Sequence, residues 1–155
     1  MNPLRINRIA LVIVGLAVAL VFVLLSGTSS GIGATRTLKV KVDYTGAGPV
    51  DEKHKIFVFL FDSPDFVQGA AMPIGSASAT SKSQTVTFES LEQSPVYVTA
   101  IYDKGGGYDG RSGPPPSGSP AGMYSKTPGT PEPIDIPEGK TVEIELTFDD
   151  SFTLP

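Results

Sequence analysis

Apolar and polar residues alternate along several short stretches of this chain, and the alternation predicts β-strands. Residues 37–44, TLKVKVDY, and residues 141–148, TVEIELTF, place an apolar side chain at every second position. A period of two puts successive side chains on opposite faces of a sheet, so each stretch predicts a strand with one buried and one solvated face. Residues 85–88, TVTF, alternate in the same way, and residues 95–102, PVYVTAIY, are rich in β-branched and aromatic residues.

A second pattern is continuous rather than alternating. Residues 55–61, KIFVFLF, are apolar without interruption after the lysine, which is typical of a central strand buried on both faces. We predict short strands near residues 77–80 and within residues 134–140, the latter ending in a turn at Glu138-Gly139. No stretch after residue 34 shows a helical period. Six to eight short strands separated by turns predict one all-β antiparallel sandwich, immunoglobulin-like in its architecture, over residues 37–150.

The N-terminal segment has a pattern of its own. Residues 9–25 are 17 apolar positions without a charge. A cleaved secretory signal usually has an apolar region of about 7–15 residues, and a membrane-spanning helix needs about 17–25. The only A-x-A-like cleavage site nearby is Ile32-Gly33-Ala34, with a bulky first residue. We therefore predict a transmembrane signal anchor over residues 9–26, with a cleaved signal peptide as the alternative.

The charges beside this segment predict its orientation. Arg5 and Arg8 precede the apolar run, and the positive-inside rule keeps such residues in the cytoplasm. Residues 1–8 are then cytoplasmic, residues 27–36 form a flexible spacer, and the sandwich lies outside the cytoplasm. The predicted location is the cell membrane, crossed once, or the secreted fraction if the segment is cleaved.

The amino-acid composition limits the kinds of partner that the chain can bind. The chain has no cysteine, which excludes disulfides and a lipid-modified cysteine. After residue 34 it carries ten basic and sixteen acidic residues, a formal net charge of −6. This balance disfavours electrostatic binding of nucleic acid or of an anionic membrane surface.

Residues suited to catalysis are scarce. His54 is the only histidine, so neither a zinc site nor a histidine-based triad is expected. Gly110 to Pro114, GRSGP, lacks the final glycine of a nucleophile elbow. Glu143 and Glu145 lie two apart on a strand and share its solvated face. We predict that the protein is not an enzyme and needs no cofactor, calcium excepted.

The longest segment without a strand pattern is residues 103–133. Seven glycines and four prolines fall between Asp103 and Gly122. Loops of this length are usually functional or disordered, so a partner-binding loop and a mobile connector are both open. Aromatic and arginine side chains are frequent interface anchors. The candidate contact residues are Tyr108, Arg111, Met123 and Tyr124.

Calcium is the most credible metal for this loop. It takes six to eight oxygen ligands, and Asp103 and Asp109 flank KGGGY as candidate carboxylate ligands. The positions between them offer no further carboxylate. Aspartates that bond to the backbone of their own turn are the alternative.

The sequence also resembles a known family over residues 55–110. KIFVFLFDSPDF followed by VTFESLEQSPVYVTAIYDKGGG is similar to the transthyretin-like (prealbumin-like, carboxypeptidase-regulatory-like) sandwich domains of secreted bacterial proteins. The matching positions are Phe88, Leu91, Tyr97, Val98, Ala100 and Asp103. The family's glycine before the tyrosine strand is absent, and glycines replace the side-chain oxygens of its cation-binding loops.

The resemblance implies a binding or structural module and names no ligand. We expect a non-catalytic, extracytoplasmic interaction module, tethered to the membrane, with a protein or surface polymer as partner. The alternative is a carbohydrate- or small-ligand-binding module stabilised by calcium.

Overall fold

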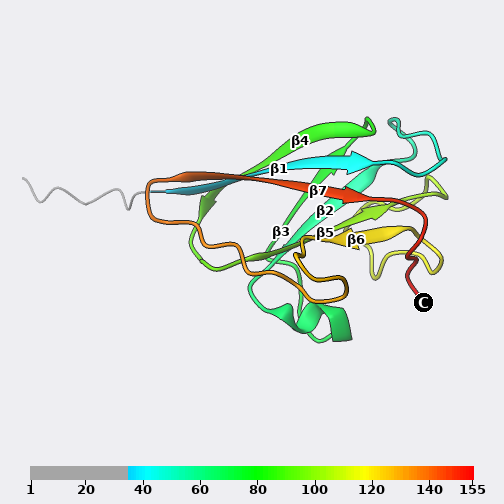
Figure 1. Cartoon of the computed structure of the whole chain (residues 1–155). Helices are drawn as coiled ribbons and strands as arrows, with labels where there is room; N and C mark the ends of the chain where they lie inside the picture. Colours follow the sequence, from blue (N-terminus) through cyan, green and yellow to red (C-terminus); the bar gives the residue numbers. More distant parts are fainter. Residues whose placement is uncertain (1–34) are drawn as a thin grey trace, which may run out of the picture. The chain divides into compact units, whose positions relative to one another are not determined.

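The computed structural model describes residues 35–155, which form two β-sheets packed face to face (Figure 1). The predicted membrane anchor, residues 9–26, and the cytoplasmic residues 1–8 lie outside the described residues. Within residues 35–155 no helix is long and apolar enough to cross a membrane. The elements are β1 (Arg36–Tyr44), β2 (Ile56–Phe61), the 3₁₀-helix η1 (Pro64–Gln68), β3 (Gly75–Ala79), β4 (Ser83–Leu91), β5 (Tyr97–Tyr102), β6 (Ala121–Met123) and β7 (Thr141–Phe148).

The strand order confirms an all-β sandwich but corrects one part of the prediction. One sheet has the order β4-β1-β7 and the other β3-β2-β5-β6. All pairs are antiparallel except β1 with β7, which run parallel in unbroken register from Thr37 and Thr141 to Tyr44 and Phe148. A purely antiparallel sandwich was therefore wrong. The cause is the segment between β6 and β7, which returns the chain to the end of the sandwich at which β1 begins.

Most predicted strands occur at the predicted places. Residues 37–44, 55–61 and 141–148 form β1, β2 and β7 within one residue of the expected bounds. The strand expected over residues 134–140 is absent, and only an isolated bridge between Ile134 and Val96 forms there. Proline at 133 and 137 explains this, because proline cannot donate to a strand ladder. Conversely, β6 lies inside the segment expected to be a loop.

The main core fills the space between the sheets. The alternating side chains of β1 point into it as predicted, and all four are at most 2% exposed. At one end of the core, the ring centroids of Tyr44 and Tyr102 are 4.5 Å apart. Besides these two tyrosines, the core consists of buried apolar side chains from the strands and from the segments beside them: Leu38, Val40, Val42, Ile56, Val58, Leu60, Ala79, Val86, Phe88, Val96, Val98, Ala100, Ile134, Ile136, Leu146 and Phe148.

A second apolar cluster covers the outer face of the four-stranded sheet. Phe57, Phe59 and Phe61 of β2 point away from the main core, yet each is at most 7% exposed. Later parts of the chain fold over them: Phe66 of η1 stacks on Phe61 with centroids 4.6 Å apart, and Tyr108 contacts Phe57. The prediction that β2 is buried on both faces is thereby confirmed.

The C-terminal tail protects the edge of this sheet. The amide of Ala121 donates to the Phe152 carbonyl at 3.0 Å, and the amide of Leu154 donates to the Ser119 carbonyl at 2.9 Å. The Leu154 side chain also packs against the outer cluster. The tail therefore adds a short ladder beside β6, and an exposed strand edge, which would invite pairing with other chains, is avoided.

Replacing Leu154 with serine should measure the contribution of the tail. The half-buried side chain removes apolar area from water, so its loss should lower the free energy of unfolding by about 1–2 kcal/mol. Chemical denaturation followed by circular dichroism gives this value. Thr153→Ser, at an exposed neighbour in the same ladder, is the control and should have almost no effect. An equal loss in both variants would contradict this account of the tail.

Candidate functional site

The glycine-rich loop, residues 103–113, begins at a buried aspartate. Asp103 is 1% exposed, and its carboxylate accepts hydrogen bonds from the amides of Gly105, Gly106 and Tyr108 at 3.2, 3.0 and 2.8 Å. Its own amide donates to the Lys55 carbonyl at 2.9 Å. One side chain therefore sets the first turn of the loop and joins it to the start of β2.

The loop then packs on the outer aromatic cluster. The Tyr108 ring meets Phe57 edge to face with centroids 5.1 Å apart, and its hydroxyl donates to the Gly113 carbonyl at 3.2 Å. Gly110 has a positive φ of 75°, and an added Cβ would lie 2.7 Å from Phe57 Cδ1. A glycine is required there on both grounds.

Asp109 closes a second turn at the loop tip. Its carboxylate accepts hydrogen bonds from the amides of Arg111 and Ser112 at 2.8 and 2.7 Å, and from the Ser112 hydroxyl at 2.6 Å. The Ser112 side-chain hydrogen bond, followed by the two amides, lowers the pKa of Asp109 to about 2. This turn presents the Arg111 side chain to solvent.

The tip should open reversibly in acid. A carboxyl whose pKa is lower in the folded than in the unfolded chain stabilises the fold above its unfolded pKa, near 3.8. That contribution falls away as the pH drops towards about 2. Between these values the amides of Arg111 and Ser112 should lose protection relative to their intrinsic exchange rates, while those of β2 stay protected. Asp109→Asn should remove the pH dependence of this protection at the tip, and its persistence in this variant would contradict the assignment.

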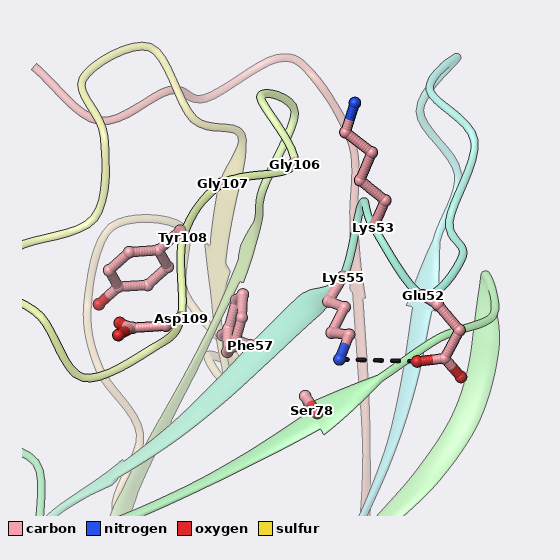
Figure 2. Close-up of a pocket in the computed structure, with 9 residues that line it drawn as sticks. All are labelled: Glu52, Lys53, Lys55, Phe57, Ser78, Gly106, Gly107, Tyr108 and Asp109. Atoms are coloured by element: carbon pink, nitrogen blue, oxygen red, sulfur yellow. Dashed lines mark ion pairs between the residues drawn. The ribbon is translucent and has the colours of Figure 1, made fainter.

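A surface hollow of about 620 Å³ lies between the glycine-rich loop and residues 52–55 (Figure 2). The backbone of Gly106 and Gly107 forms one side, and Lys53 and Lys55 stand on the other. The residues around it are Glu52, Lys53, Lys55, Phe57, Ser78, Gly106, Gly107, Tyr108 and Asp109. This lining combines two aromatic side chains with charged and polar ones, which suits a small polar ligand that has one apolar face.

Several charged groups beside the hollow already have partners. Lys55 Nζ is 3.6 Å from a Glu52 carboxylate oxygen. His54 Nδ1 lies 3.0 Å from the Asp51 carboxylate, which also accepts the amides of His54 and Lys53. Those amides, with His54 first, lower the pKa of Asp51. In the described part of the chain, Asp51 is the one hydrogen-bond partner of the His54 ring, so the pair closes a turn.

Side chains from other parts of the domain also hold the loop before β2 in place. The Tyr102 hydroxyl donates to the Pro49 carbonyl at 2.6 Å, and the Tyr44 hydroxyl donates to Asp150. The same Asp150 carboxylate accepts the Ala47 amide at 3.1 Å. Both loops that flank the hollow are therefore held by buried or half-buried side chains.

The four predicted contact residues do not form one surface. Tyr108 and Arg111 lie together in the glycine-rich loop. Met123 is half-buried on β6, and Tyr124 packs against the main core between the sheets. Tyr108 belongs instead to the outer cluster. A single aromatic platform of Tyr108 and Tyr124 is thus not present.

The two predicted calcium ligands, Asp103 and Asp109, hold separate turns. Asp103 accepts three hydrogen bonds from amides of the glycine-rich loop. Asp109 accepts three hydrogen bonds from groups at the tip of the same loop. Among residues 35–155, no group of three or more histidine, cysteine, aspartate or glutamate residues is placed to hold a metal ion. Calcium binding stays a prediction.

The residues of the hollow that face the glycine-rich loop were not predicted from the sequence. Lys53 and Lys55 were visible only as part of a charged turn, and Ser78 as part of a small polar stretch. Their approach to the glycine-rich loop depends on the pairing of β2 with β3 and β5, which no local pattern encodes. Glycines at 106 and 110, where an added side chain would collide with Lys53 and Phe57, were the available signal.

No protein-family model, curated protein or solved structure matches this chain.

Proposed function

We propose that the protein is a membrane-tethered, extracytoplasmic interaction module without catalytic activity. Its contact surface is the distal surface, defined as residues 45–55 and the glycine-rich loop 103–113. The partner is a protein or a polymer of the cell envelope. The N-terminal apolar run supplies the tether, and the sandwich holds the contact surface away from it.

The observation that carries this proposal is the position of the distal surface. Residue 36, where the chain enters the sandwich, and the distal surface lie at opposite ends of β1 (Figure 1). Nine residues of strand span about 30 Å at roughly 3.3 Å per residue. A domain tethered through residue 36 therefore presents the two loops outward.

The entry point is firmly held, as a tether requires. The Arg36 guanidinium donates to the Ile136 and Glu92 carbonyls at 2.9 and 3.1 Å, and it pairs with Glu138 at 3.0 Å. β1 itself is the central strand of its sheet, with β4 on one side and β7 on the other. A pull on the spacer would therefore act on the central strand of the three-stranded sheet.

A small-ligand function is the second candidate, and the hollow favours it. Its lining includes the aromatic residues Phe57 and Tyr108, and Ser78 and Lys55 offer polar groups, a combination suited to a saccharide. The transthyretin-like resemblance supports either kind of binding and remains a proposal. The position of Asp103 directly after the tyrosine strand is the feature of the resemblance on which the glycine-rich loop depends.

Site-specific photocrosslinking in intact cells tests the first proposal. A photoreactive amino acid replaces Arg111 on the distal surface in the full-length chain, and Thr85, exposed on β4, is the matched control position. We expect a discrete adduct from position 111 and none from position 85. Adducts of equal yield at both positions, or none at either, would reject the distal surface as the contact.

A further inference from the structure

The segment between β2 and β3 carries an unusual exposed surface. We define the apolar projection as residues 66–74, FVQGAAMPI, which contain no charged side chain. Val67, Met72 and Ile74 are 51%, 82% and 44% exposed. Only one other large hydrophobic residue in the described part of the chain, Phe152, is comparably exposed. Exposed apolar residues gathered on one segment mark a surface that contacts something.

The projection is a built feature of the fold. The Ser63 hydroxyl accepts the Asp65 amide at the start of η1, and Gly69 ends the helix with a positive φ of 72°. The Ile74 amide then donates to the Leu60 carbonyl at 2.8 Å. Phe66 packs inward on Phe61, so the outward direction of the remaining apolar side chains is imposed by the fold.

The projection follows the end of β2, which is the end of the sandwich where the chain enters. Arg36 bonds to the Ile136 carbonyl, and Ile134 pairs with Val96. Tyr97, which follows Val96 and begins β5, is the register partner of Phe61 at the end of β2. In Figure 1 the projection is the green segment with a coiled turn at the bottom of the view, outside the two sheets.

We infer that the apolar projection rests in the interfacial layer of the same membrane that holds the N-terminal segment. The inference rests on the proposed tether. The predicted spacer, residues 27–36, spans at most about 36 Å when fully extended, and about 17 Å on average as a flexible coil. The entry end of the domain is therefore confined close to the bilayer, and an uncharged apolar segment there lowers its free energy by entering the headgroup layer.

The negative charge of the domain limits which lipid headgroups the projection can contact. The domain carries a formal net charge of −6, and Asp62 and Asp65 directly precede the projection. An anionic surface would repel it, so the contact depends on apolar area and suits zwitterionic headgroups such as phosphatidylcholine.

The absence of tryptophan from the chain allows a direct test. Met72→Trp places a unique fluorophore on the projection, at a position exposed enough to leave the fold unchanged. Glu52→Trp is the matched control, because the Glu52 side chain is 86% exposed and lies on the distal surface. Each full-length variant is reconstituted in phosphatidylcholine vesicles with and without brominated acyl chains. Retention of the chain by the vesicles after alkaline carbonate washing is measured in the same samples.

We expect the Met72→Trp variant to show a blue-shifted emission and several-fold stronger quenching by brominated lipid than the Glu52→Trp variant. Adding Val67→Ser and Ile74→Ser should reverse both effects. Chain retained by the vesicles but quenched equally at both positions would overturn the membrane contact while leaving the tether intact. A chain lost on washing would refute the tether itself. A blue shift that depends on protein concentration in detergent would assign the projection to self-association and overturn the inference.

Discussion

Gly122→Val should be among the most destabilising single substitutions in the domain. Gly122 lies on β6 and faces the other sheet, where an added Cβ would overlap Phe148 Cβ and lie 3.0 Å from Phe148 Cγ. These atoms sit at the base of a buried side chain on β7, so they cannot swing away. Overpacking a core usually costs about 1–3 kcal/mol, and a branched side chain here should cost at least about 3 kcal/mol. Thermal denaturation should show a melting temperature lower by roughly 10 °C or more.

Gly107→Ala is the matched control for this substitution. Gly107 is also a glycine on the chain between β5 and β7, but nothing lies within 4 Å of an added Cβ and its φ is not positive. The melting temperature of this variant should stay close to that of the original protein. A Gly122→Val variant as stable as Gly107→Ala would show that β6 does not pack against β7 as described.

Asp103→Ala should release the glycine-rich loop. The substitution deprives three amides of their acceptor, and leaving a buried donor unpaired costs about 1–3 kcal/mol. Because Gly105 is exposed and can bond to water, the total should be about 3 kcal/mol rather than the full sum. Denaturant titration gives the global loss. Hydrogen exchange should show the amides of Gly105, Gly106 and Tyr108 opening before those of β2.

Two further variants separate the role of Asp103 from a general effect of charge. Asp103→Asn keeps the shape and one acceptor oxygen, so it should fall between the original protein and the alanine variant. Asp109→Ala removes a carboxylate from the exposed tip and should leave the exchange of the Tyr108 amide unchanged. Equal effects of Asp103→Ala and Asp109→Ala would contradict the view that Asp103 sets the loop.

Local patterns predicted the strands whose burial is one-sided or complete. β1 and β7 alternate because one face meets the core and the other meets water, where Lys39 pairs with Glu143 at 3.1 Å. The continuous apolar run of β2 also gave the correct burial, although the pattern alone did not show that later segments of the chain cover its outer face.

Non-local pairing explains what the sequence did not reveal. β6 is only three residues long and contains a glycine, so it has no strand pattern of its own and depends on β5 and the C-terminal tail. Because β6 was not predicted, the face of the four-stranded sheet on which Tyr124 lies was not predictable. Tyr108 and Tyr124 therefore looked like equivalent contact residues of one loop. The parallel pairing of β1 with β7 joins residues about a hundred positions apart.

We propose above all that the chain is tethered by its N-terminal segment and presents the distal surface outside the cytoplasm. The chain has no cysteine, so Glu52→Cys and Asn7→Cys each create a unique labelling site. In sealed, right-side-out membrane vesicles, a membrane-impermeant maleimide should label the Glu52→Cys variant at once and the Asn7→Cys variant only after detergent is added. Labelling of the Asn7→Cys variant in sealed vesicles, or protection of the Glu52→Cys variant, would contradict the account.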